Sequence, residues 1–334
     1  MKRFGRDNIS LTELEGYLNG KDVDWVDLAT RTGTTQEHNL SLRGGTEKAR
    51  YYFSGTLHET KGIAKNDNFN RYSLRTSIDT QFKPWLKIGS SSQMALYNRD
   101  GRPANFRDAF RMNPFAEPFN EDGSINLYPW PENSYYSNPL EPLNIEHADR
   151  TYRVLTSNYL QVDFPFLEGL SYRLNAGGSF RNRHVETYYG ENTLRGIEQK
   201  GASQLDFWLN YDWTLENLLY YNRTFGEHTL GVTALYSAQE KTVKDHDFDG
   251  TGFPSHTRTN YQNGAAAVLL GSDSYAVTAN LSQMARINYA FRSTYMLTST
   301  ARRDGYSAFG NDTKFGVFPS VGLGWNMEHE ASRP

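Results

Sequence analysis

An acidic motif is the first set of residues whose spacing could do chemistry. Asp245-x-Asp247-x-Asp249-Gly250 reproduces the first half of an EF-hand calcium loop. Its twelfth position would be His256 instead of the bidentate glutamate, so the complete motif is absent. We therefore expect a solvated acidic loop, and a cation bound by Asp245, Asp247 and Asp249 is the weaker alternative.

An aromatic segment at residues 98–150 is the second candidate, and it is also rich in proline. A loop of about fifty residues without regular structure usually has a function. Its rings could stack on sugars or contact a partner protein, or they could pack the loop against itself. We take Tyr128, Trp130, Tyr135 and Tyr136 as the candidates for ligand or partner contact.

Catalytic chemistry is not indicated by any other group of residues. The eight histidines are scattered, and the absence of cysteine excludes a thiol nucleophile, a zinc ribbon and a disulfide framework. A glycosidase needs two carboxyls roughly 5–9.5 Å apart, and nothing singles out a pair such as Asp206 and Asp212. We expect no enzyme activity, no cofactor and no metal beyond the weak acidic candidate.

Composition narrows the class of protein that must position these residues. The 334 residues carry 35 Lys+Arg and 38 Asp+Glu, and a net charge of −3 argues against a nucleic-acid partner. Aromatic residues make up 14% of the chain, yet mean hydropathy is only −0.70. A soluble all-β protein has this composition, and so does a membrane β-barrel whose strands are apolar on one face.

Period-two alternation runs along almost the whole chain. Tyr72, Leu74 and Ile78 alternate with Arg71 and Arg75, which predicts a strand with one apolar and one polar face. The pattern predicts about eleven strands, at approximately 36–43, 49–60, 69–82, 86–98, 151–164, 170–181, 204–222, 229–243, 275–288, 293–303 and 317–327. In a membrane barrel the apolar faces point outward and the polar faces line the lumen. We therefore expect Leu74, Ile78, Leu209, Tyr211 and Leu323 outside, and Arg71, Arg75, Asp206 and Asn210 on the concave side.

The connections between these strands alternate in length. Short turns alternate with long loops near 98–150, 182–203, 244–274 and 304–316. Outer-membrane barrels have this arrangement, with short periplasmic turns and long extracellular loops. Ser10-x-x-Glu13 predicts a capped helix that ends near Gly20, and we assign residues 1–35 to an extracellular loop segment. Residues 36–334 are then the barrel region.

Five stretches occur in order along the chain: QEHNLSLRGGTEKARYY at 36–52, RYSLR at 71–75, WLKIG at 85–89, RRDGYSAFG at 302–310 and FPSVGLGW at 318–325. Together they resemble the barrel of SusC/RagA-type TonB-linked outer-membrane transporters. The resemblance implies an antiparallel up-and-down transmembrane β-barrel of about 22 strands with a plug in its lumen. It also implies active import of oligosaccharides or peptides by a multi-pass protein in the outer membrane of a Gram-negative bacterium.

Partners also follow from the resemblance: a SusD-type surface lipoprotein, outer-membrane lipid and the TonB complex. The sequence shows no signal peptide, plug or TonB-binding segment, so we expect an internal fragment covering roughly the second to twelfth barrel strands. TonB would then act through a missing N-terminal part. The alternative function is that of a soluble secreted all-β protein that binds or degrades carbohydrate, in which the apolar residues would fill a dry interior.

Overall fold

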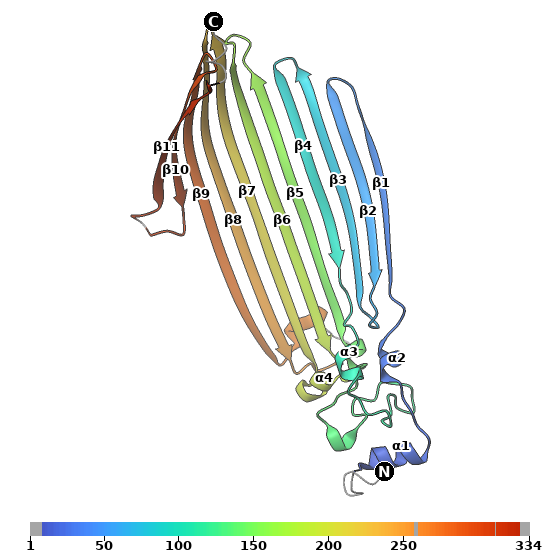
Figure 1. Ribbon diagram of the computed structural model, residues 1–334. Coiled ribbons are helices and arrows are strands. Elements are labelled where there is room, and N and C mark those ends of the chain that lie inside the picture. The colour runs from blue at the N-terminus through green and yellow to red at the C-terminus, as the bar shows by residue number, and fades with distance from the viewer. Residues whose placement is uncertain (1–8, 257–259, 311, 328–334) are drawn as a thin grey trace.

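The computed structural model describes residues 9–256, 260–310 and 312–327, which form one antiparallel sheet with small helices at one end (Figure 1). The strands are β1 (Thr34–Gly45), β2 (Ala49–Lys61), β3 (Asn68–Lys83), β4 (Leu86–Asn98), β5 (Glu146–Asp163), β6 (Leu170–Tyr189), β7 (Ala202–Phe225), β8 (His228–Thr251), β9 (Val268–Phe291), β10 (Tyr295–Tyr306) and β11 (Phe315–Trp325). The α-helices are α1 (Leu11–Leu18), α2 (Trp25–Ala29), α3 (Phe106–Ala109) and α4 (Leu194–Gln199), with 3-10 turns η2 (Pro131–Asn133), η3 (Glu141–Asn144) and η5 (Asn260–Ala265).

Each strand pairs with the strand that follows it in the chain, and every pair is antiparallel. The predicted up-and-down order of about eleven strands is therefore confirmed. Among the described residues β1 pairs only with β2 and β11 only with β10, so the sheet is open. Its two edge strands keep unpaired backbone groups, which a lipid environment cannot satisfy.

The two ends of the sheet differ. Short turns join strands at one end, whereas all the labelled α-helices gather at the other (Figure 1). The β5–β6 turn needs glycine at position 169, because the backbone there has a φ of +87° and a Cβ would meet the Asn222 carbonyl oxygen at 2.0 Å. Tight turns of this kind keep neighbouring strands in register at the short-turn end.

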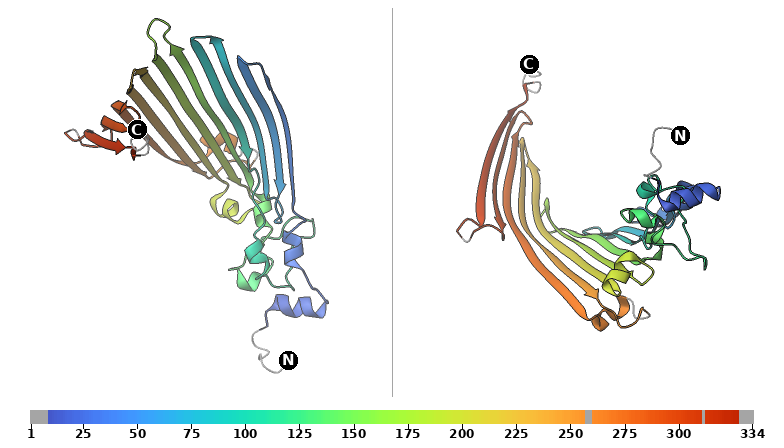
Figure 2. Two further views of the ribbon diagram at one scale, coloured as in Figure 1. Left: turned by 45° about the horizontal axis from the view of Figure 1, so that its top comes forward. Right: turned by 90° about the horizontal axis from the view of Figure 1, so that it is seen from below.

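The sheet is bent, so it has a hollow and a convex face (Figure 2). The direction of its backbone hydrogen bonds shows which face of the sheet a strand residue's side chain occupies. The Asp149 carbonyl oxygen accepts a hydrogen bond from Arg99 N, so the peptide groups of Asp149 point toward β4. Because amino acids have the L configuration, a β5 residue whose peptide groups point toward β4 has its side chain on one defined face of the sheet. For Asp149 this is the hollow face. Alternation then puts Thr151 and Arg153 on the hollow face, and Tyr152 and Val154 on the convex face.

The convex face carries the apolar side chains of the strands. Leu74, Ile78 and Leu323 have exposed fractions of 48%, 45% and 84%, and Leu209 and Tyr211 are half-buried on the same face. These residues do not fill a dry interior, which the soluble alternative requires. In water such an apolar surface would be unfavourable, and in a bilayer it is the expected outer face of a barrel.

Strands β6 to β9 are longer than the alternation of apolar residues predicts. Near their loop ends the convex face carries charged and imidazole groups, and His246 there contacts Asp273 at 2.5 Å. Charge on this face marks where the apolar band ends. The predicted loops at 182–203 and 244–274 are therefore wrong in extent: the connections are 190–201 and 252–267. Backbone hydrogen bonds extend the ladder beyond the apolar band, and a pattern based on hydrophobicity does not detect that extension.

The acidic motif lies in this extended part of β8, so the expectation of an acidic loop is wrong. Alternation puts Asp245, Asp247 and Asp249 on the hollow face of a strand. Asp247 lies directly opposite Asp206 of β7, so the two residues share the hollow face. A calcium loop wraps its ligands around an ion, and a straight strand cannot do so.

Candidate functional site

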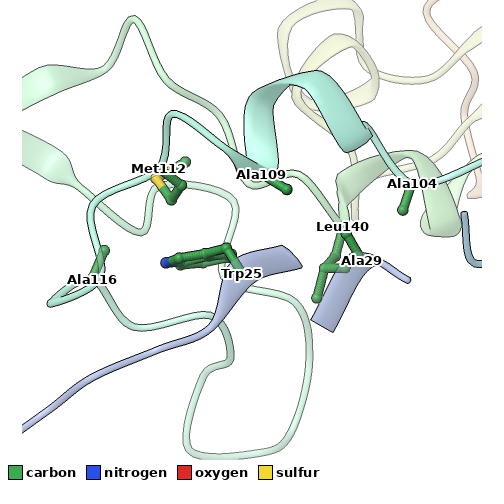
Figure 3. Packing of buried hydrophobic residues seen from close by; sticks show 7 residues of the cluster. All are labelled: Trp25, Ala29, Ala104, Ala109, Met112, Ala116 and Leu140. Atoms are coloured by element: carbon green, nitrogen blue, oxygen red, sulfur yellow. The ribbon is translucent and has the colours of Figure 1, made fainter. Parts of the chain in front are cut away.

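A compact lobe stands at the loop-bearing end of the sheet, and it contains the aromatic candidates. We call residues 9–33 together with 99–145 the loop lobe. Trp25 of α2 is its central residue: the indole is 3% exposed, donates from Nε1 to the Asn113 carbonyl oxygen at 2.8 Å, and packs in a cluster with Met112 and Leu140 (Figure 3). The loop of residues 99–145 is therefore folded around α2.

Helix α1 is fixed to the same lobe. Its capping box is confirmed, because Ser10 Oγ accepts from Glu13 N and the Glu13 side chain accepts from Ser10 N. The Glu132 carboxylate accepts from Thr12 Oγ1 at 2.7 Å, and Gly16 lies so close to Phe115 that a Cβ would be 2.5 Å from the Phe115 Cβ. Segments far apart in the sequence therefore form one lobe.

The structure divides the four aromatic candidates into two pairs. Trp130 and Tyr136 pack against the buried cluster, with ring centroids 6.0 Å apart and an interplanar angle of 12°. Trp130 Nε1 also donates to Ser10 Oγ at 3.2 Å. These two rings stabilise the lobe, so their surfaces are largely used by the fold.

Tyr128 and Tyr135 are the candidates that remain accessible. Their exposed fractions are 51% and 85%, and the Tyr135 ring meets Tyr136 edge to face at a centroid distance of 5.2 Å. An exposed tyrosine offers an apolar ring and a hydroxyl, which suits contact with a sugar ring or a protein. Contact of either residue with a ligand or partner stays a prediction.

Glu141 links the loop lobe to the connection between β6 and β7 by a hydrogen bond. Its Oε1 accepts a hydrogen bond from Leu194 N, at the first residue of α4, at 3.2 Å. Burial raises the pKa of the Glu141 carboxyl above its usual value, and the hydrogen bond from Leu194 opposes that shift. The Glu141 carboxyl therefore stabilises the folded state fully at pH values below the pKa it has in the unfolded chain. This stabilisation is lost as pH rises through the pKa that the carboxyl has in the folded protein.

Replacing Glu141 by glutamine should strengthen this link at neutral pH. Glu141→Gln keeps an oxygen acceptor for Leu194 N but removes the buried charge, so amide hydrogen exchange in α4 should be slower than in wild type at about pH 7.5. The two proteins should match at about pH 4, where the wild-type carboxyl is protonated. The control Glu141→Ala removes the acceptor and should speed exchange at both values. Faster exchange in Glu141→Gln at neutral pH would contradict the assignment.

The hollow wall beside the lobe is strongly polar. Arg183 of β6 forms a bidentate ion pair with Asp149 of β5, with Nε–Oδ1 and Nη2–Oδ2 distances of 2.9 and 2.8 Å. Asp212 of β7 accepts a hydrogen bond from Ser179 Oγ. This wall can bind polar groups, and the Asp212 carboxylate already accepts a hydrogen bond from a neighbouring strand.

Metal-ligating clusters and membrane-spanning helices are two features that the described ranges lack. Within the ranges given above, no group of three or more His, Asp or Glu side chains is arranged to hold a metal ion. Over the same ranges, no helix combines the length and apolarity needed to cross a membrane.

Two residues of the wall were not singled out from the sequence. Arg153 of β5 and Arg181 of β6 lie directly opposite each other in the register. Alternation assigns each to a polar face, but only the register between the two strands brings them together. The short turn between the strands is the sequence feature that could have predicted it.

An open up-and-down sheet with an apolar convex face, a polar hollow face and its long connections at one end has the architecture of an outer-membrane β-barrel wall. Comparison with known proteins makes the assignment more specific. The chain is 28% identical to TonB-dependent receptor P3 of Formosa agariphila over 332 residues, or 95% of this chain and 33% of the relative. It is 25% identical to TonB-dependent receptor SusC of Bacteroides thetaiotaomicron over 350 residues, or 95% and 34%.

The solved structures agree in fold. A structure of the RagAB peptide transporter superposes with a TM-score of 0.72 at 20% identity, covering 94% of this chain and 36% of that one. An FpvA–pyoverdine complex of Pseudomonas aeruginosa has a TM-score of 0.52 at 12% identity, covering 88% and 39%. No family model matches the sequence. These comparisons confirm the resemblance to SusC/RagA-type TonB-linked transporters, and the chain spans about a third of the length of the curated relatives.

Proposed function

We propose that the chain forms part of the wall and external loops of an outer-membrane importer energised by TonB. Its substrates are oligosaccharides or peptides, and its partner is a SusD-type surface lipoprotein. The carrying observation is the division of each strand into an apolar convex face and a polar hollow face, along a sheet that matches SusC-type receptors over 95% of the chain.

The role of each part follows from its chemistry. The convex side chains contact lipid, and the hollow face lines the path of the ligand. The loop lobe and the connections at 190–201 and 252–267 face the outside of the cell, where Tyr128 and Tyr135 are available for ligand or partner contact. In this proposal the described side chains supply binding groups and carry out no covalent chemistry.

Two features support the named partners and substrates. The similar receptors are named TonB-dependent, and a similar structure is a peptide transporter. Polar side chains that alternate along a wide wall suit a hydrated chain molecule such as an oligosaccharide or peptide. The open edges of the sheet fit a longer barrel in which further strands pair with β1 and β11.

Uptake by living cells tests the proposal. Deleting the gene from a bacterium that carries it should abolish uptake of at least one fluorescent oligosaccharide or peptide from a panel, and restoring the gene should restore uptake. Inactivating TonB in the complemented strain should abolish uptake again. Uptake that persists without TonB would indicate a passive porin, and a protein recovered from the culture medium would support the soluble alternative.

A further inference from the structure

Two arginines face each other on the hollow wall without a carboxylate between them. Arg153 of β5 and Arg181 of β6 are a direct cross-strand pair, and both are exposed. Side chains at such positions start from Cβ atoms about 4.5–5.5 Å apart, and like charges directly opposite each other are destabilising. A protein keeps such a pair only if the repulsion serves a purpose or is neutralised by something that binds.

Neighbouring arginines show how this wall neutralises charge elsewhere. Arg183, two residues along β6, has its bidentate partner Asp149, and Arg150 of β5 pairs with Asp100 at 2.7 Å. Over the described parts of the chain, neither Arg153 nor Arg181 forms an ion pair. Asp212 lies on the adjacent strand and accepts from Ser179 Oγ, without pairing with Arg181.

Arg181 is nevertheless held in place. Its guanidinium carbon lies 4.7 Å from the centroid of the Trp208 ring on β7, a cation–π arrangement. Stacking on an indole orients the planar guanidinium and leaves its N–H groups available for hydrogen bonds. A fixed guanidinium beside a second, unpaired one is suited to bind an oxyanion through several charge-assisted hydrogen bonds.

We propose that Arg153, Arg181 and Trp208 form a recognition site for an oxyanion group, a carboxylate or a sulfate ester, on the transported chain molecule. The inference rests on the proposed import function and specifies its substrate class. Arg153 and Arg181 bind the oxyanion, and Trp208 positions Arg181. A bound anion removes the repulsion between the two arginines, so ligand binding stabilises this part of the wall.

Binding to the purified full transporter tests the site. The probes are an oligogalacturonate for carboxylate, a sulfated dextran oligomer for sulfate ester, and a maltooligosaccharide of similar length as the neutral control. Calorimetry should detect binding of at least one anionic probe that weakens with added salt. The double variant Arg153→Gln/Arg181→Gln should weaken that binding at least tenfold. The matched variant Arg75→Gln, which removes an exposed arginine elsewhere on the hollow face, should not.

Thermal unfolding without ligand separates binding from a structural role. If the arginines repel each other, Arg153→Gln should leave the empty protein as stable as wild type or raise its Tm. A lowered Tm would mean that Arg153 supports the fold, and would overturn the proposal. Equal binding of the anionic probes by wild type and the double variant would also overturn it. TonB-dependent uptake of neutral ligands unaffected by the double variant would leave the import function standing.

Discussion

Cysteine introduced in place of Tyr135 is expected to react with a polyethylene glycol maleimide on intact cells, whereas cysteine in place of Glu168 is expected to react only after the outer membrane is opened. Tyr135 lies in the loop lobe and is 85% exposed, and the Glu168 side chain lies in the β5–β6 turn and is 87% exposed. Both positions are accessible to solvent, so only the membrane separates their reactivity. The reagent is too large to pass the outer membrane.

The sequence makes this measurement simple, because it contains no cysteine and each variant therefore has a single thiol in this chain. Ile197→Cys in α4 provides a second external position in case a partner covers Tyr135. Gel shifts quantify the reaction before and after permeabilisation. Equal labelling of Glu168→Cys and Tyr135→Cys on intact cells would contradict the assignment of the two ends of the sheet.

A charge placed on the convex face should be far more damaging than one placed on the hollow face. Ile78 lies on the convex face of β3 and is 45% exposed, whereas its neighbour Ser77 lies on the hollow face. Arginine on the lipid face of a barrel costs about 2–4 kcal/mol near the bilayer midplane. We therefore expect Ile78→Arg to reduce the folded protein in the outer membrane strongly.

Ser77→Arg is the matched control, because it adds the same side chain one residue away. It lies between Arg75 and Asp79 on the hollow face, so its charge remains hydrated. Quantitative gel analysis of outer-membrane fractions, with and without heating, measures the folded population. If Ser77→Arg were the more damaging change, the polar face and not the apolar face would be in contact with lipid.

Much of the sheet is predictable from the sequence because lipid imposes a simple pattern. Alternation locates β4 at 86–98, the same bounds as in the structure. Alternation does not predict the part of a strand that lies beyond the apolar band. Strand β8 continues to Thr251, past Lys244 and His246, because backbone hydrogen bonding does not require apolar side chains. Strand existence is therefore predicted well, and strand length above the membrane is not.

The candidate site was less accessible to prediction. Composition alone cannot distinguish Trp130 from Tyr135, because Trp130 is covered only when α1 brings Ser10 to its indole nitrogen. Arg153 and Arg181 look like ordinary polar-face residues until the β5–β6 register sets them opposite each other. In both cases the decisive contact joins residues separated in the chain, and local periodicity carries no information about it.

The unequal strand lengths give the external rim an uneven height. β7, β8 and β9 have 24 residues each, whereas β10 has 12, and strands rise about 3.3 Å per residue. From the common short-turn end, the rim therefore falls steeply from β9 to β10. In the proposed importer, this wall would stand higher at β7 to β9 than at β10. A bulky polymer would therefore have more clearance on the β10 side of the wall than on the β7 to β9 side.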